Sequence, residues 1–196
     1  NNNLEARYLY TTALFNAKEY CEAITEVKTL NAMNFSNFYT ERMYAFAYSE
    51  NNTDTLALDK ALAASDRFFS IVPQDKISYQ DYKLRGTILQ KKGQDSLAIA
   101  EFERASALSE TAAKELSTEL IKMYNKNKMY EKTIAAYEKR IFSDDPTVNV
   151  PAAIRWNAYE SSIMALLPRP AQAGQTIDGE IELARARVQI HYIRHD

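Results

Sequence analysis

Two histidines near the end of the chain are the residues with the clearest potential for chemistry. His191 and His195 lie four positions apart in QIHYIRHD, and on a helix this spacing places both rings on one face, as metal ligands require. No Asp or Glu lies between them, and the chain has 2 histidines in all. We therefore interpret the pair as packing or terminally exposed residues and predict no metal site.

The other residue types do not form the pattern of an active site. Catalysis by a nucleophile and a base usually needs a histidine within reach, and nothing in the sequence singles out a pair of carboxylates. Cys21 is the single cysteine, which excludes an intrachain disulfide and a cysteine-built metal site. Gly86 and Gly93 belong to a helix and a turn, not to a phosphate loop. Asp144 and Asp145 precede a proline and are typical of turns and caps. The sequence thus predicts a protein that is not an enzyme and uses no cofactor.

Charge gives no reason to expect nucleic acid. The 24 basic and 26 acidic side chains nearly cancel. The run KMYNKNKMYEK, from Lys122 to Lys132, interleaves lysines with aromatic residues as nucleic-acid-binding proteins do, but a solvated helix face with buried tyrosines explains it better. No apolar run approaches the roughly 18 residues that a helix needs to cross a bilayer. We expect protein or peptide partners, no nucleic acid and no membrane insertion, and the oligomeric state stays open.

These residues must be positioned by helices. Apolar residues recur at spacings of three and four in YKLRGTILQ and SLAIAEFERASAL, and the intervening KKGQD is typical of a tight turn. With 4 Gly and 5 Pro and no sustained alternation, strands are not predicted. Pro73 and Pro146 mark boundaries that a helix does not pass. Ser109 and Asn149 are the expected N-caps of the helices that follow them.

An internal repeat organises the helices. Gly86 and Leu89 on one predicted helix, and Ala98, Phe102 and Ala105 on the next, form a template of small residues and rings. Small residues at helix crossings let neighbouring backbones approach, and rings fill the adjacent space. The equivalent residues of the other units are Thr11, Leu14, Ala23, Val27 and Leu30; Ala45, Tyr48, Ala61, Ser65 and Phe68; and Ile121, Tyr124, Thr133, Tyr137 and Arg140.

The stretches YKLRGTILQKKGQDSLAIAEFERASAL and LIKMYNKNKMYEKTIAAYEKRI resemble the tetratricopeptide repeat (TPR), and the chain looks like a bacterial TPR-containing protein. The resemblance implies an all-α fold, an alpha-alpha superhelix (a solenoid) of about five helical hairpins forming a single domain over 1–196. Thr133 and Arg140 replace the alanines of the family pattern, which implies a looser contact or a unit near the edge of the regular array. The expected units cover 4–34, 37–73, 79–110, 112–146 and a divergent 150–196.

The divergent unit is the least regular part. VPAAIRWNAYESSIMALL is predicted to be its first helix, with Trp156, Tyr159 and Ile163 in packing positions. A loop follows over 168–179, longer than most connections in compact domains, and we interpret it as a solvated excursion. Helical spacing resumes in EIELARARVQIHYI.

The resemblance also implies a peptide-binding surface, because the first helices of successive TPR units line a concave face. Some family members clamp a terminal carboxylate with Lys and Asn. Lys83 occupies one such place, but Thr87 and Glu119 stand where Asn is expected, so we do not predict the clamp. Aromatic and Met side chains suit an apolar or amphipathic peptide, and for Met43 and Phe46 packing between helices is an equal alternative. The residues implied to line the surface are Tyr8, Phe15, Tyr39, Arg42, Met43, Phe46, Lys83, Thr87, Gln90, Lys122 and Asn125.

Several functions are consistent with a helical repeat that has a concave binding surface. The first is a non-enzymatic scaffold for protein–protein interaction that holds a peptide or partner helix in its concave groove. The alternatives are a sensor or regulatory repeat region of a larger multidomain protein, and a module that binds a glycan or small molecule. The beginning NNNLEA is typical of a portion cut from a longer precursor. The Tyr, Asn and Lys usage favours the periplasm or cell envelope over the cytoplasm.

Overall fold

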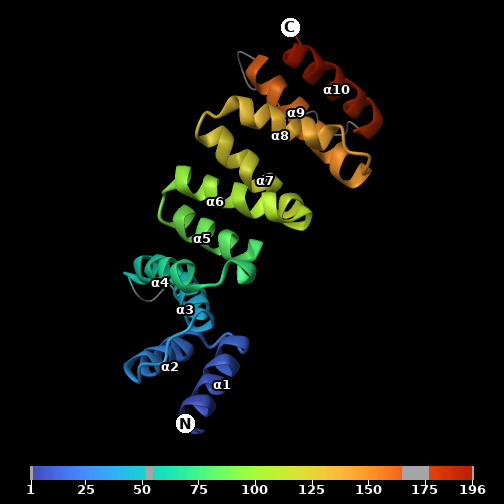
Figure 1. Ribbon diagram of the computed structural model, residues 1–196. Coiled ribbons are helices and arrows are strands. Elements are labelled where there is room, and N and C mark those ends of the chain that lie inside the picture. The colour runs from blue at the N-terminus through green and yellow to red at the C-terminus, as the bar shows by residue number, and fades with distance from the viewer. Residues whose placement is uncertain (1, 52–54, 165–176, 196) are drawn as a thin grey trace. The chain divides into compact units, whose positions relative to one another are not determined.

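The computed structural model describes residues 2–51, 55–164 and 177–195 (Figure 1). This part of the chain holds ten α-helices, a short 3₁₀ turn at Gln74–Lys76 and no strand, which confirms the prediction of an all-α fold. Among these described helices, none combines the length and apolarity needed to cross a membrane. The helices are α1 (Asn2–Asn16), α2 (Tyr20–Ala32), α3 (Phe38–Glu50), α4 (Ala57–Ile71), α5 (Tyr79–Lys91), α6 (Asp95–Leu108), α7 (Glu110–Lys126), α8 (Tyr130–Ile141), α9 (Pro146–Met164) and α10 (Gly179–His195).

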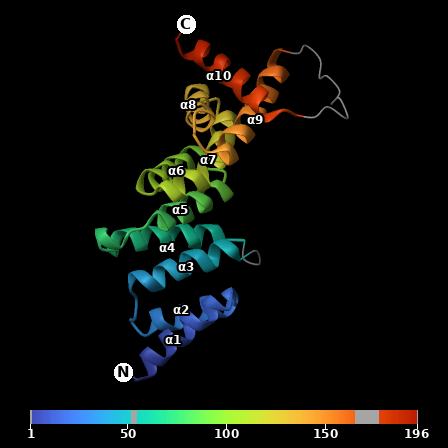
Figure 2. The same cartoon turned by 90° about the vertical axis from the view of Figure 1, so that its right-hand side faces the viewer.

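Four pairs of successive helices form hairpins, as the repeat pattern predicts. α1 contacts α2, α3 contacts α4, α5 contacts α6 and α9 contacts α10, and Figure 2 shows α3 lying alongside α4. Three turns share one backbone geometry, with a positive φ of 64° at Lys18, 73° at Gly93 and 57° at Lys128. In the α5–α6 turn the Gln94 N–H donates to the Leu89 carbonyl at 2.9 Å, which satisfies a carbonyl at the helix end.

The contacts divide the chain into two compact units, Asn1–Leu116 and Ser117–Asp196. The boundary lies inside α7 and therefore inside the repeat expected over 112–146. The single domain over 1–196 and the bounds of its repeats stay predictions. The first unit holds α1 to α6, and the second holds α8 to α10.

A close approach between Gly86 of α5 and Phe102 of α6 shows why the small residues are needed. A Cβ added at Gly86 would lie 2.7 Å from two atoms of the Phe102 ring, so the ring occupies the space that a side chain would fill. Phe102 is 2% exposed, and Ala98 and Ala105 on either side of it along α6 are fully buried. The prediction that the small–ring–small pattern of α6 forms a buried helix face is therefore confirmed.

The first two hairpins bury the equivalent positions. Thr11, Ala23, Ala45 and Ala61 are all buried, as the template predicts. One apolar cluster draws side chains from α2, α3, α4 and α5, so the hairpins of this unit share a continuous core. Its buried members are Ile24, Ala47, Tyr48, Ala57, Ala61 and Ile88.

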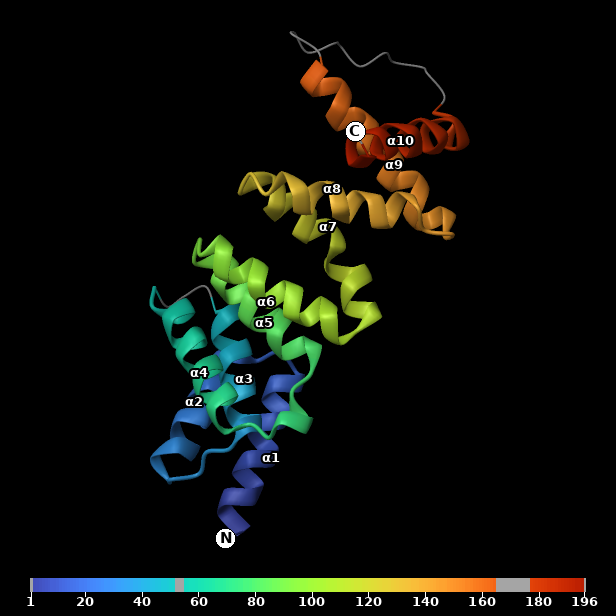
Figure 3. The ribbon, with the colours of Figure 1, turned by 45° about the horizontal axis from the view of Figure 1, so that its top comes forward.

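The core of the second unit lies among α8, α9 and α10, which contact one another, and Figure 3 shows α10 against α9. At the two places where the family pattern has alanine, hydrogen bonds accommodate larger residues. The hydroxyl of buried Thr133 donates to the Met129 carbonyl at 3.2 Å, and Nη1 of half-buried Arg140 donates to Thr118 Oγ1 at 2.8 Å. The buried apolar residues of this core are Ile121, Tyr137, Ile141, Ala152, Ala153, Trp156, Ala186 and Ile190.

One predicted helix cap is confirmed and one is wrong. Ser109 precedes α7, and its hydroxyl accepts the Ala112 N–H at 3.4 Å. Asn149 instead lies inside α9, where its Nδ2 donates to the Ser143 carbonyl at 2.8 Å. The cap of α9 is Asp145, whose carboxylate accepts the Thr147 N–H at 2.9 Å. Proline favours the first position of a helix, so α9 begins at Pro146.

The predicted loop over 168–179 falls largely outside the described residues. α10 begins at Gly179, at the end of that range.

A buried carboxylate joins the second hairpin to the third. Asp81 of α5 is 4% exposed, and its two oxygens accept hydrogen bonds from Nε and Nη2 of Arg42 on α3 at 2.7 and 2.9 Å. Oδ2 also accepts the backbone N–H of Ser78 at 2.8 Å, which caps α5. The Arg42 guanidinium lies 4.9 Å from the centre of the Phe68 ring of α4. One acidic side chain therefore fixes the start of α5 against α3.

We predict strong coupling between Gly86 and Phe102. Gly86→Ala should lower the free energy of unfolding by about 1 to 2 kcal/mol, because overpacking outweighs the roughly 1 kcal/mol gain in helix propensity. In a Phe102→Leu background the clash is relieved, and the same change should be neutral or stabilising. Urea denaturation of the four proteins followed by circular dichroism measures the coupling. Additive losses would show that the ring does not occupy the space beside Gly86.

We also predict that Asp81→Asn lowers the free energy of unfolding by about 2 to 3 kcal/mol, because it leaves the Arg42 guanidinium without its buried counter-charge. The matched control is Asp66→Asn. Asp66 is 54% exposed and pairs with Arg85 at 2.6 Å, so its loss should cost about 1 kcal/mol or less. Denaturant titration compares the two variants, and equal losses would contradict the proposed role of Asp81.

Candidate functional site

Nine of the residues predicted to bind a partner lie on the first helices of the hairpins in the first unit, α1, α3 and α5, and eight of them, all except the buried Met43, form one set. We call these eight residues the first-helix face. Phe15 of α1 and Phe46 of α3 meet edge to face, with ring centres 5.4 Å apart. The face consists of Tyr8, Phe15, Tyr39, Arg42, Phe46, Lys83, Thr87 and Gln90.

Sequence reasoning missed a third ring beside this pair. Tyr20, the first residue of α2, has its ring centre 6.0 Å from that of Phe15 and 5.7 Å from that of Phe46. All three side chains are half-buried, so part of each ring is accessible. We call these three residues the aromatic corner. The only sequence signal for Tyr20 is an aromatic residue directly after a turn.

The other apolar candidates differ in exposure. Tyr39 is 46% exposed and lies against Phe38, with ring centres 4.1 Å apart. Tyr8 is half-buried beside Phe35 at 5.7 Å. Met43 is only 9% exposed, so its side chain packs in the interior and offers little surface to a partner. For Met43 the structure supports the packing alternative.

The cationic candidates of the face are engaged in ion pairs between helices. Arg42 pairs with Asp81, as described above, and Lys83 pairs with Glu115 of α7. The Thr87 hydroxyl donates to the Lys83 carbonyl at 2.9 Å, and Gln90 is half-buried. Because their charges are compensated, Arg42 and Lys83 do not make the face a strongly positive surface.

Lys122 and Asn125 belong to the second unit and are not grouped with the face. The Lys122 ammonium lies 3.5 Å from Glu119, one turn away on α7, and its side chain is 70% exposed. Asn125 is half-buried, and its Oδ1 lacks a hydrogen-bond partner within the described part of the structure.

The His191 and His195 rings do approach each other on α10, with centres 4.7 Å apart, and both side chains are exposed. Over residues 2–51, 55–164 and 177–195, no group of three His, Cys, Asp or Glu side chains is arranged to hold a metal ion.

Burial shifts the pKa of three groups. It raises the pKa of the Tyr44 phenol, which also shares a hydrogen bond with Tyr48, and it raises the pKa of Tyr137. Burial lowers the pKa of the Arg140 guanidinium, with the like charge of Arg155 as a further cause. Both shifted tyrosines are neutral at neutral pH, so neither can act as a base there.

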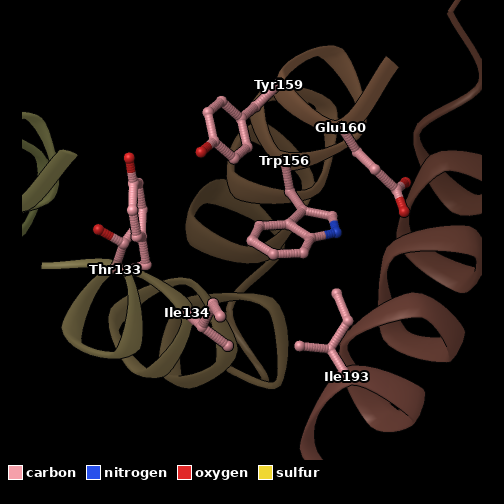
Figure 4. A pocket seen from close by; sticks show the side chains of 7 residues that line it. Thr133, Ile134, Trp156, Tyr159, Glu160 and Ile193 are labelled. Atoms are coloured by element: carbon pink, nitrogen blue, oxygen red, sulfur yellow. The ribbon is translucent and has the colours of Figure 1, made fainter. Parts of the chain in front are cut away.

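A cavity of about 490 Å³ lies in the second unit, where sequence reasoning predicted only packing (Figure 4). Trp156 and Tyr159, expected in packing positions, both line it, while the side chain of Ile163 falls outside the described residues. The Trp156 ring is 3% exposed and meets Tyr137 with ring centres 5.4 Å apart. The lining residues are Tyr130, Thr133, Ile134, Trp156, Tyr159, Glu160 and Ile193.

No family model matches the chain. The fold is similar to the crystal structure of the C-terminal part of a TPR repeat-containing protein from Cytophaga hutchinsonii, with a TM-score of 0.64 and 23% sequence identity. The similarity covers 94% of this chain and 66% of that chain, so the present chain spans just under two thirds of the other's length. At this identity the likeness shows the fold. The chain has a TPR-like, all-α helical repeat fold.

Proposed function

We propose that the chain is a non-enzymatic protein-interaction module, and that the first-helix face binds an apolar or amphipathic peptide or a partner helix. The observation that carries the proposal is the aromatic corner. Phe15, Tyr20 and Phe46 come from three helices and are held together while remaining partly accessible. Rigid aromatic residues of this kind give large contact area at a low entropic cost.

The charge pattern of the face supports an uncharged or amphipathic partner. Arg42 and Lys83 already have acidic partners within the unit, so an acidic peptide would have to compete with Asp81 and Glu115. The exposed ring of Tyr39 adds a further aromatic contact on α3. The eight face residues include no His, Cys, Asp or Glu, which are the side chains most often used as catalytic bases and nucleophiles.

Selection from a displayed library of short peptides tests this proposal, with a Tyr39→Ala, Phe46→Leu double variant as the probe. Leucine at position 46 keeps the apolar volume, so the hairpins should stay folded. The selected peptides should bind the double variant at least about tenfold more weakly, since aromatic anchors contribute more than 1 kcal/mol to such interfaces.

The matched control is Tyr10→Ala. Tyr10 is an exposed aromatic residue of the same unit, on α1, with 53% of its surface accessible, and it is not part of the face. Its affinity for the selected peptides should equal that of the unaltered protein. Peptides that bind the double variant as tightly as the unaltered protein would place the binding surface elsewhere.

A further inference from the structure

The cavity of the second unit is walled by aromatic and aliphatic side chains from three helices. Figure 4 shows Thr133 and Ile134 on α8, Trp156, Tyr159 and Glu160 on α9, and Ile193 on α10 around one space. Its volume of about 490 Å³ falls within the range of roughly 300 to 1,000 Å³ typical of small-ligand sites. The space is therefore larger than a packing defect.

Two polar atoms of the wall have no hydrogen-bond partner within the described residues. They are Nε1 of Trp156 and Oε2 of Glu160, and both are almost completely shielded from solvent. Figure 4 shows the indole nitrogen and the Glu160 carboxylate on the side of the indole ring that faces α10. A buried donor and a buried acceptor without partners are costly, and a ligand that pairs with both removes that cost.

The charge of the wall selects the kind of ligand. Glu160 is the one charged residue among the seven that line the cavity. Tyr130, Trp156 and Tyr159 present π-systems, which attract cations to their faces. Two of the nearby cations are engaged elsewhere, since Arg194 pairs with Glu138 at 3.1 Å and the Lys132 ammonium lies 5.6 Å from the centre of the Tyr124 ring. An anion would be repelled, and a purely apolar ligand would leave both polar atoms unpaired.

We propose that this cavity binds an organic cation carried on an apolar stem, such as the side chain of a lysine or arginine in a peptide, or a free alkylamine. The ammonium or guanidinium pairs with the Glu160 carboxylate, and the stem packs against Ile134, Ile193 and the Trp156 ring. A carbonyl or hydroxyl oxygen next to the stem accepts the Trp156 Nε1–H. The site lies in the second unit and does not depend on binding at the first-helix face.

The chain contains a single tryptophan, so the indole N–H resonance of Trp156 reports on this site without mutation. We expect saturable shifts of that resonance when the full chain is titrated with Nα-acetyl-lysinamide. Nα-acetyl-norleucinamide has the same apolar stem without the ammonium and should bind at least about tenfold more weakly. Equal binding of the two probes, or no saturable shift with the lysine probe, would overturn the proposal.

Butylamine distinguishes the two sources of the cation. Binding as tight as that of the lysine probe shows that the cavity recognises a free amine. Weaker binding shows that the amide groups contribute and that the source is a peptide. Both ligands carry the ammonium, so either result, together with weaker binding of the norleucine probe, supports the site.

Glu160→Gln removes the charge while keeping the shape, and it should weaken the lysine probe about tenfold or more without changing the norleucine probe. Glu131→Gln is the control, because Glu131 is exposed, lies next to Tyr130 in the chain and does not line the cavity. If Glu160→Gln does not fold, Tyr130→Ala replaces it. Tyr130 is 52% exposed, and loss of its ring should weaken the lysine probe several-fold. Unchanged affinity in the folded variant would contradict the proposal.

Discussion

The steric fit between small residues and rings at helix crossings is the constraint on which the architecture depends. Gly86 has no side chain because the Phe102 ring already fills that space, and Ala98 and Ala105 keep α6 free of bulk on either side of the ring. A single helical hairpin cannot bury its apolar face, so stability requires that neighbouring hairpins approach closely. The spacing of the small residues along the chain then determines which side chains remain at the surface.

Polar contacts between hairpins add to this packing and define the chemistry of the exposed face. Asp81 binds Arg42 across α3 and α5, and Lys91 donates to the Ser49 carbonyl at 2.7 Å near the end of α3. Arg42 and Lys91 are thus engaged in contacts between helices. The accessible part of the first-helix face is therefore dominated by partly buried rings. These polar groups between the hairpins are paired, whereas two polar atoms beside the cavity at Trp156 have no hydrogen-bond partner among the described residues. This difference distinguishes the cavity from ordinary packing.

The sequence predicts the helices and hairpins well because apolar spacing and small-residue positions are local patterns. The buried state of Ala98, Phe102 and Ala105 followed directly from their spacing. The cap of α9 was predicted wrongly because Asp145 and Asn149 are both cap-forming residues, and the choice depends on where Pro146 starts the helix. In the turns, Lys18 and Lys128 adopt the left-handed geometry that Gly93 adopts, so residue type alone does not reveal these turns.

The sites are harder to predict, because they depend on contacts between residues far apart in the chain. The sequence indicates Arg42 as a candidate binding residue, and it gives no sign of the ion pair with Asp81, which lies on another hairpin. The packing of Trp156 was predicted from the sequence. That its indole N–H and Glu160 Oε2 lack hydrogen-bond partners among the described residues becomes apparent only once α8, α9 and α10 are assembled.

Hydrogen exchange in an Ala61→Glu variant tests the central claim of nearest-neighbour stacking most directly. Ala61 is fully buried on α4, so the charge should break one crossing. If stability is transmitted between adjacent hairpins, amide protection should fall in α2, α3, α4 and α5 and stay unchanged in α8, α9 and α10. Equal loss of protection in every helix would show a single cooperative core and contradict the account.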